Sequence, residues 1–376
     1  MRPITQNITR STKLLQHLDS SRLECFRQSL IEWYRNYRRD MPWRQTKDPY
    51  AVWVSEIMLQ QTRVDQVRPY YDRFMDRFPT VKHLSKAPLE VVLKAWEGMG
   101  YYARARNLHR AARLIVDEHG GQIPEDPARI SDLPGIGPYT TAAILSIAFG
   151  RDCPVVDGNV VRVLSRLFHL TDNPASSAAR KRIDGIAGRL LARGRAGDFN
   201  QAMMELGATI CTPRKPRCGA CPVNPFCEAR KLLPDPSVLP RRQPRKQRPH
   251  HHVAAAIVRR DDKVLIVRRP TEGLLGGLWE FPGGISKEKA VSKRILHNEI
   301  KRQLGIEIRV GHVFATVKHA FTHFEMTLQG YLCTYLSGEA RHRDGNDFCW
   351  IRFGEFERYA FPKAHIRLIE SITVVE

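Results

Sequence analysis

Four of the eight cysteines lie within 17 residues of one another and have the spacing of metal ligands. They follow the pattern C-x6-C-x2-C-x5-C, as Cys211, Cys218, Cys221 and Cys227. Thiolates at such spacing bind either tetrahedral zinc or an iron–sulfur cluster. Zinc is the more general interpretation, but zinc sites usually pair two short C-x2–4-C units, and this segment has only one. Irregular loop spacing also suits a cubane cluster, so both metals stay open, with a structural role expected.

Two carboxylates nearer the N-terminus have neighbours that could adapt them to acid–base chemistry. Asp48-Pro49 predicts a helix start, and we expect that helix to continue through Trp53–Thr62, with Glu56 on it. Taken alone, Glu56 could be a solvated surface residue, but its many apolar neighbours would raise its carboxyl pKa by desolvation. Asp157, which precedes a glycine, is by itself most simply a turn residue.

A glycine-rich turn lies between these two acids. Leu133-Pro-Gly-Ile-Gly137 is followed by Pro138 and an apolar stretch with helical periodicity, Ala142–Phe149. Glycines permit a tight turn, and the free N–H groups at the following helix start form a ready phosphate site. The chain carries 60 Lys and Arg against 39 Asp and Glu, a net charge of +21. That surplus favours a polyanionic partner, and a helix-hairpin-helix over an ordinary turn.

The periodicity of apolar residues divides the chain. From about residue 20 to 230 the spacing is helical, as in Leu89–Trp96. Leu233–Pro249 follows, with five prolines, five cations and one acid, a composition that predicts a linker. Beyond it, strand-like runs at His252–Val258 and Val264–Val267 flank a polar turn and predict a β-hairpin, and a helix is expected around residues 291–304. The second domain is therefore expected to be α+β.

Together these features resemble the adenine DNA glycosylases of the MutY family, within the helix-hairpin-helix superfamily of endonuclease III. The segments that carry the resemblance are WVSEIMLQQT, GMGYYARARNLHRAA, LPGIGPYTTAAILS, VVDGNVVRVLSR, NQAMMELGATIC and the four-cysteine spacing. The resemblance implies a mainly α helix-hairpin-helix glycosylase domain with an iron–sulfur cluster loop, plus an α+β Nudix-like domain. The expected divisions are a flexible tail (1–20), the glycosylase domain (21–230), a basic linker (231–250) and the Nudix-like domain (251–376).

By this resemblance Glu56 protonates the departing adenine, while ionised Asp157 stabilises the sugar cation, as in two-carboxylate glycoside hydrolysis. A helix N-terminus and the Asn159 amide are expected to keep the pKa of Asp157 low. Lyase members of the superfamily carry a lysine where this chain has Tyr139. Tyrosine cannot form a Schiff base, so we expect a monofunctional enzyme in which Tyr139 holds Asp157 or the sugar.

The resemblance also implies residues that contact DNA. Gln61, Thr62 and Tyr101 match the residues that fill and wedge the duplex, and the hairpin glycines Gly135 and Gly137 lie at the phosphate site. Arg44 and Glu205 are candidates for the edge of adenine. The family reads 8-oxoguanine through a Phe-Ser-His loop, which is here Phe321, Thr322 and His323.

Two segments of the second domain resemble a Nudix fold, Trp279–Gly284 and Asn298–Ile306. A Nudix hydrolase needs clustered carboxylates to hold divalent metal. Aligned on Leu-Gly-Ile, the expected acids fall on Ala290, Arg302 and Gln303, and only Glu299 is kept. We therefore expect no nucleotide hydrolysis and no catalytic metal.

The resemblance implies one [4Fe-4S] cluster and a monomer acting on double-stranded DNA with adenine opposite 8-oxoguanine or guanine. Repair or replication proteins are possible partners of the linker, and no membrane association is expected. The enzyme would be cytoplasmic and nucleoid-associated in a bacterium, or nuclear or mitochondrial in a eukaryote. Two alternatives stay open: an endonuclease III-like lyase for damaged pyrimidines, and an inactive DNA-binding module.

Overall fold

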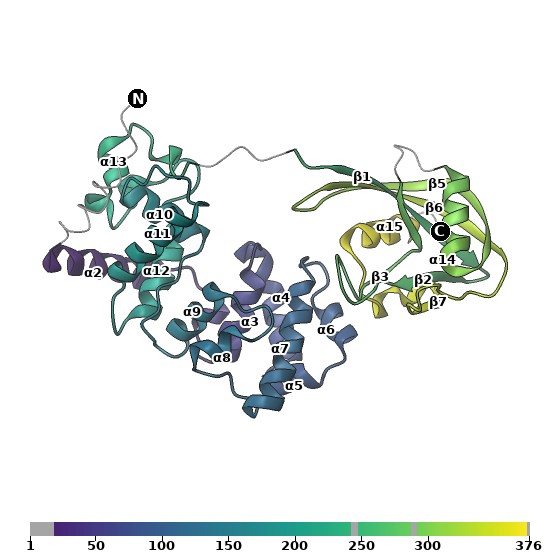
Figure 1. Cartoon of the computed structure of the whole chain (residues 1–376), viewed down its shortest axis with the longest axis horizontal. Helices are drawn as coiled ribbons and strands as arrows, with labels where there is room; N and C mark the ends of the chain where they lie inside the picture. Colours follow the sequence, from purple (N-terminus) through teal and green to yellow (C-terminus); the bar gives the residue numbers. More distant parts are fainter. Residues whose placement is uncertain (1–18, 242–246, 287–291, 374–376) are drawn as a thin grey trace. The chain divides into compact units, whose positions relative to one another are not determined.

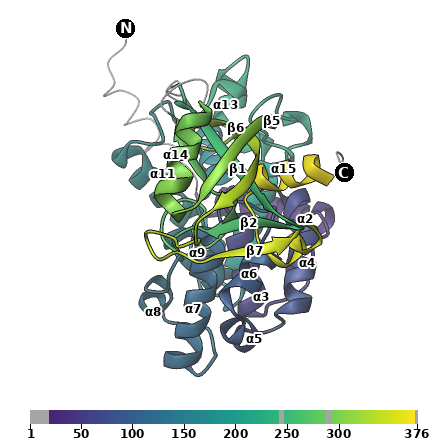
Figure 2. The same ribbon diagram turned by 90° about the vertical axis from the view of Figure 1, so that its right-hand side faces the viewer.

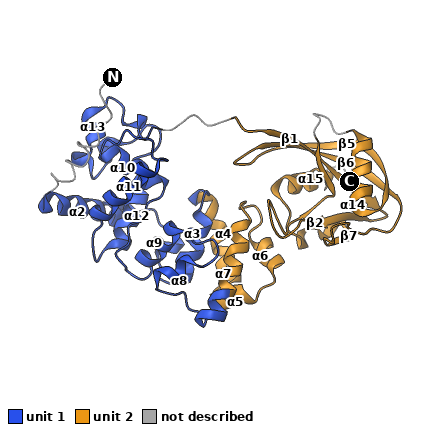
Figure 3. Ribbon diagram, in the orientation of Figure 1, with its two compact units in different colours: residues 1–64, 114–245 blue, residues 65–113, 246–376 orange. Residues whose placement is uncertain are grey.

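The computed structural model describes residues 19–241, 247–286 and 292–373. The expected N-terminal tail (except for its last two residues), part of the linker and Ala290 fall outside the described residues. The chain divides into two units, residues 1–64 with 114–245 and residues 65–113 with 246–376 (Figure 3). Within the described residues, no helix combines the length and apolar character needed to cross a membrane.

Unit 1 is helical and contains a large apolar core. Its helices are α2 (Ser20–Tyr37), α3 (Pro49–Leu59), α8 (Pro127–Ser131), α9 (Pro138–Ile147), α10 (Gly158–Leu167), α11 (Ser177–Leu190), α12 (Ala196–Thr209) and α13 (Glu228–Leu232). The core joins apolar residues of α2, α10, α11 and α12, including the fully buried Leu30, Leu164 and Ile183. These helices support the cavity and the cysteine loop described below.

Two of these helices begin at the acids that the sequence indicated. Asp48 caps α3 by accepting a hydrogen bond from the Tyr50 N–H, and Asp157 caps α10 by accepting one from the Val160 N–H. The prediction that the first of these helices continues through Thr62 is wrong: it ends at Leu59. Gln61 has a φ of 57°, a left-handed backbone that an α-helix cannot continue.

Unit 2 combines a helical segment with a mixed β-sheet. Its helices before residue 114 are α4 (Val64–Arg77), α5 (Val81–Lys86), α6 (Leu89–Ala95) and most of α7 (Ala103–His119). Its strands are β1 (His250–Arg260), β2 (Lys263–Arg268), β3 (Trp279–Glu280), β4 (Gly283–Ser286), β5 (Glu307–Ala320), β6 (Glu325–Ser337) and β7 (Phe348–Arg352). The expected hairpin is confirmed, since β1 pairs with β2 in antiparallel register.

A helix covers each face of this sheet (Figure 1 and Figure 2). Successive residues of β1 point to opposite sides: Ala256 packs with α14 (Lys293–Leu304), and Ile257 packs with α15 (Lys363–Thr373). β1 runs parallel to β6, and the order along the main path is β3-β2-β1-β6-β5. The expected fold class, a helical domain followed by an α+β domain, is confirmed.

Candidate active site and cysteine cluster

Unit 1 contains a cavity of about 170 Å³ that gathers most of the candidate catalytic residues. Its walls come from the 3-10 turn Pro42–Arg44, from α3, α9 and α12, and from the start of α10. The lining includes Arg44, Glu56, Thr62, Tyr139, Asp157, Asn159, Met204 and Glu205. Residues as far apart in the sequence as Arg44 and Glu205 therefore meet at one small site.

Glu56 is a deeply buried carboxyl of this cavity. Its residue surface is only 6% exposed, because α3 is buried along almost its whole length. Burial raises the pKa of Glu56 to about 7, and the nearby charge of Asp157 adds to the rise. The sequence predicted this direction from the apolar neighbours, and the same cause operates here.

Tyr139 contacts a different carboxyl from the one expected. Its hydroxyl donates to Glu56 Oε2 at 2.8 Å and lies 3.4 Å from the sulfur of Met204. The expectation that Tyr139 holds Asp157 is therefore wrong for the described structure. The reason is the geometry of α9, which places Tyr139 in its first turn and packs against α3.

Asp157 is held by the hydrogen bonds that the sequence predicted. The Val160 N–H donates to its Oδ1 at 2.7 Å, and the Asn159 side-chain amide donates to its Oδ2 at 2.8 Å. However, the expectation of a low pKa is wrong. Burial raises the pKa of Asp157 above its usual value, and the two hydrogen bonds only partly oppose that effect.

Glu205 and Arg44, the candidates for the adenine edge, are paired with each other. Arg44 donates to Glu205 Oε2 at 2.7 Å, and Arg39 donates through its Nε to Oε1 at 2.7 Å. Burial alone would raise the pKa of Glu205, but these two guanidinium groups lower it to about 2. The carboxylate is thus ionised, and both of its oxygens accept hydrogen bonds from arginines. Arg39 is a site residue that the sequence analysis missed.

The candidate DNA-contacting turns have unusual backbones. Gln61 in unit 1 and Tyr101 in unit 2 have φ values of 57° and 49°, a region that residues with side chains rarely adopt. Gly135 has a φ of 80°, so the hairpin requires glycine there, whereas Gly137 has an ordinary φ and begins α9 without a side-chain cap. The first N–H groups of α9 therefore lack a side-chain partner at this cap.

The candidate lesion-reading residues form the tip of the β5–β6 hairpin in unit 2. The Phe321 N–H donates to the Phe324 carbonyl at 2.8 Å, and the two rings stack at 4.5 Å between centroids. Thr322 and His323 are exposed at the tip. The Thr322 hydroxyl is hydrogen-bonded to the hydroxyl of Tyr101, and both line a cavity of about 540 Å³.

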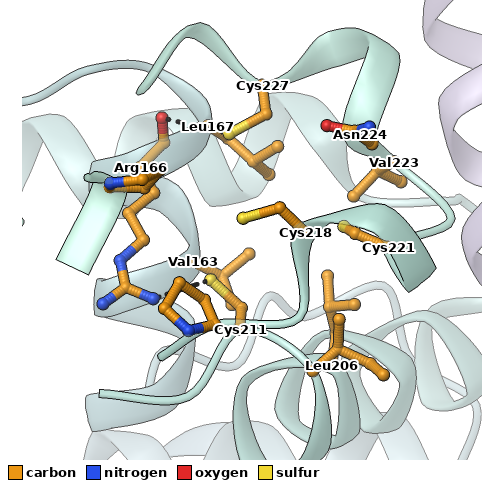
Figure 4. A pocket seen from close by; sticks show the side chains of 13 residues that line it. Val163, Arg166, Leu167, Leu206, Cys211, Cys218, Cys221, Val223, Asn224 and Cys227 are labelled. Atoms are coloured by element: carbon orange, nitrogen blue, oxygen red, sulfur yellow. Dashed lines mark hydrogen bonds between the residues drawn. The ribbon is translucent and has the colours of Figure 1, made fainter. Parts of the chain in front are cut away.

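The four clustered cysteines surround a separate small cavity in unit 1 (Figure 4). Cys211, Cys218, Cys221 and Cys227 reach it from a loop that Val163, Leu167 and Leu206 back with apolar side chains. Across the described residues, no three His, Cys, Asp or Glu side chains are grouped to hold a single metal ion.

Two buried arginines of α10 tie this loop to its surroundings, and the sequence analysis missed both. Arg166 donates to Cys211 Sγ at 3.3 Å and to the Leu239 carbonyl at 3.0 Å, so the start of the expected linker packs on unit 1. Arg162 donates to Asn159 Oδ1 and to the Cys211 carbonyl, both at 2.8 Å. Asn159, Arg162 and Arg166 recur at three- and four-residue spacing, the one signal that could have found them.

The Nudix-like helix carries no comparable carboxylate site. Glu299 on α14 accepts hydrogen bonds from Arg302 Nε at 3.0 Å and from Gln303 at 2.7 Å. The bond from Arg302 is the main reason that the pKa of Glu299 lies below its usual value. Its charge is thus neutralised by the cation that replaces an expected acid.

Three stretches of the chain match known protein families. Residues 54–187 match the HhH-GPD superfamily base excision DNA repair proteins, residues 211–227 match the iron-sulfur binding domain of endonuclease III, and residues 253–371 match the NUDIX domain. The iron-sulfur match favours an iron–sulfur cluster over zinc at the four cysteines.

Individual relatives extend over most of the chain. Human adenine DNA glycosylase is 36% identical over 83% of this chain and 67% of its own length. The adenine DNA glycosylase of Buchnera aphidicola subsp. Acyrthosiphon pisum is 30% identical over 92% of this chain and 97% of its own. The structure of a thermostable thymine-DNA glycosylase is 32% identical, covers 57% of this chain and 100% of its own, and has a TM-score of 0.52. The chain belongs to the adenine DNA glycosylase family.

Proposed function

We propose that this adenine DNA glycosylase hydrolyses the N-glycosidic bond of adenine opposite 8-oxoguanine or guanine and leaves an intact abasic site. The observation that carries the proposal is the cavity in which Glu56, Tyr139 and Asp157 meet. A neutral carboxyl and a hydrogen-bonded carboxylate at one site supply the acid and the cation stabiliser that this reaction needs.

Glu56 is the proton donor in this mechanism. With a pKa of about 7, its carboxyl keeps its proton in a large fraction of molecules near neutral pH. Because Tyr139 donates to Oε2, that oxygen acts as an acceptor and the acidic proton resides on Oε1. Among the described residues Oε1 has no hydrogen-bond partner, so its proton is available to the departing base.

Asp157 stabilises the positive charge that develops on the sugar. Its two oxygens are fixed by the Val160 N–H and the Asn159 amide, which hold the carboxylate without supplying a proton to it. The partly buried setting strengthens its interaction with a nearby cation, since water screens the charge less there. A sugar cation in the cavity would in turn favour the ionised form of Asp157.

The absence of an amine at this site supports monofunctional chemistry. Tyr139 occupies the second position of α9, directly after the hairpin, and lysine is absent from the described lining of the cavity. Without an amine no Schiff base forms with the sugar, so water completes the reaction and the strand stays intact. This argues against the endonuclease III-like lyase alternative.

Three features support engagement of duplex DNA. Gln61 and Tyr101 occupy strained turns of the kind that concentrate at functional sites, and Tyr101 presents an aromatic ring with 45% exposure that can stack between bases. Gly135 and Gly137 present the start of α9 to phosphate. Arg44, held by Glu205, lies in the cavity wall, which supports a contact with the edge of the flipped adenine.

The Nudix-like domain, residues 251–376, is proposed to read the base opposite adenine. Thr322 keeps the hydroxyl of the family serine and lies exposed at the hairpin tip between Phe321 and His323. Its neighbours in the hairpin are stacked aromatic rings, which brace a short loop. Residues 21–230 then form the glycosylase domain, and residues 231–250 link the two.

The four cysteines fit a [4Fe-4S] cluster. Thiolates are the ligands such clusters use, and all four cysteine side chains line one small cavity, where they would hold the cluster. When bound, the cluster cross-links the loop and fixes its exposed cations Arg214, Lys215 and Arg217 on the surface. No step of base removal depends on it.

The test is single-turnover cleavage of a duplex with one adenine opposite 8-oxoguanine, analysed with and without alkali. Strand breaks that appear only after alkali support a monofunctional adenine glycosylase. Breaks without alkali would indicate lyase chemistry. Binding without any cleavage by cluster-replete protein would indicate an inactive DNA-binding module.

A further inference from the structure

Within unit 2, an ion pair of the helical segment forms hydrogen bonds with the backbone of the Nudix-like domain at two residues. Glu97 Oε1 accepts a hydrogen bond from the Phe361 N–H at 2.7 Å, and Oε2 accepts one from Lys94 Nζ at 2.6 Å. Lys94 also donates to the Tyr359 carbonyl at 2.9 Å. The Glu97 and Lys94 side chains are only 19% and 27% exposed, so water competes weakly for these bonds.

One of the two bonded residues, Phe361, belongs to the core of the Nudix-like domain. The Phe361 carbonyl accepts a hydrogen bond from the Tyr102 hydroxyl at 3.4 Å, so both backbone groups of Phe361 are bonded to the helical segment. The Phe361 ring is 1% exposed and packs against Phe281 and Phe356. A movement of Glu97 would therefore displace Phe361 and disturb the buried side chains that pack on the sheet.

The same short segment forms the turn that carries Tyr101. Gly98 and Gly100 have φ values of 91° and 74°, and a Cβ on Gly98 would lie 2.3 Å from the Tyr70 hydroxyl. The Gly100 carbonyl accepts hydrogen bonds from Trp96 Nε1 at 3.1 Å and from Arg104 at 3.2 Å. This rigid turn ends at Tyr101, whose hydroxyl meets that of Thr322 at the hairpin tip.

We propose that Glu97 is a positioning residue for lesion discrimination, an inference that rests on the proposed function. Glu97 fixes Phe361 directly and holds Lys94, which in turn fixes Tyr359. These bonds set the place of the β5–β6 tip relative to the Tyr101 turn, so that Tyr101 and Thr322 act together. The acid–base chemistry belongs to residues of unit 1. Loss of these hydrogen bonds therefore changes the preference for 8-oxoguanine over guanine opposite adenine more than it changes the rate of base removal itself.

The test compares single-turnover excision of adenine opposite 8-oxoguanine and opposite guanine by the full-length, cluster-replete protein. Glu97→Ala is expected to lower the ratio of the two rates about tenfold, the scale of one charge-assisted hydrogen bond. Glu97→Gln keeps an oxygen that can accept from the Phe361 N–H, so it should retain more of the ratio than Glu97→Ala. Glu118→Ala, at an exposed acid of α7, is the matched control and should leave the ratio unchanged.

A double-mutant cycle separates positioning from general destabilisation. Thr322→Val removes the reading hydroxyl, and in that background Glu97→Ala should cause no further loss of the ratio. Two outcomes would contradict the positioning role but not the proposed lesion reading. One is an additive loss of the ratio in the double variant; the other is an unchanged ratio in Glu97→Ala while the wild type prefers 8-oxoguanine. A wild type without any preference would contradict the proposed lesion reading, and the positioning role with it. Thermal unfolding of each variant shows whether it is folded.

Discussion

The cavity of unit 1 and the Nudix-like helix of unit 2 both present a glutamate where catalysis could occur. The environments of these two glutamates shift their pKa values in opposite directions. Glu56 is almost fully buried, and burial raises its pKa to about 7. Glu299 is partly exposed and paired with Arg302, which lowers its pKa. Residue type alone therefore does not identify a catalytic acid. A carboxyl that can hold a proton at neutral pH needs desolvation without a neutralising cation.

The largest expected effect comes from exchanging each glutamate for its amide. Glu56→Gln should lower the single-turnover rate of adenine release about 10³-fold, because the amide cannot donate the required proton. Glu299→Gln should leave this rate unchanged, since that carboxylate is neutralised outside the cavity. Equal losses in both variants would break the comparison.

Asp157→Asn should lower the same rate about 10²-fold, through loss of the charge that stabilises the sugar cation. Asparagine is also a good helix N-cap, so α10 should keep its start and the thermal stability should change little. A folded Asp157→Asn protein with full activity would remove Asp157 from the mechanism.

The pH dependence of the single-turnover rate should follow the raised pKa of Glu56. A carboxyl with a pKa of about 7 is protonated below that pH and loses its proton above it. The rate should therefore fall about tenfold per pH unit above pH ~7. It should also fall on acidification as Asp157, whose pKa is raised by burial, becomes protonated. A rate that stays constant through alkaline pH would exclude Glu56 as the acid.

Tyr139→Phe should have a smaller effect that sharpens this assignment. The Tyr139 hydroxyl donates to Glu56 and lowers its pKa, so removing the hydroxyl should move the alkaline limb of the profile to higher pH. The maximal rate should fall about fivefold, as expected for one lost hydrogen bond. If the profile keeps its position, the hydrogen bond to Glu56 has no functional role.

The smallest expected signal is nucleotide hydrolysis by the Nudix-like domain. With Glu299 paired to Arg302, α14 lacks a carboxylate cluster to bind Mg²⁺. Full-length protein incubated with Mg²⁺ and 8-oxo-dGTP should therefore release no pyrophosphate above a protein-free control. Turnover that requires Glu299 would show that the second domain is an active hydrolase.

Local sequence signals predicted much of the site. The cap at Asp48, the apolar neighbours of Glu56, and the helix N-terminus and Asn159 amide beside Asp157 are all local features, and each is present in the structure. The four cysteines are also recognisable from spacing, because one loop carries them all.

Contacts between distant segments could not be predicted in the same way. Arg39 pairs with Glu205 across 166 positions, and Tyr139 bonds to Glu56 across 83. The packing of α2 against α12 and of α3 against α9 decides these partners. The pKa of Asp157 was misjudged for a related reason: its hydrogen bonds are local, whereas its burial depends on the whole cavity.

The central claim is that Glu56 carries a proton near neutral pH, and infrared difference spectroscopy tests it most directly. The spectrum of Glu56→Gln is subtracted from that of the wild type across a pH series, which isolates the carboxyl of Glu56. The account predicts a protonated-carboxyl band that persists at pH 6 and disappears with a midpoint of about 7. A band that has already disappeared below pH ~5, as for an ordinary glutamate, would contradict it.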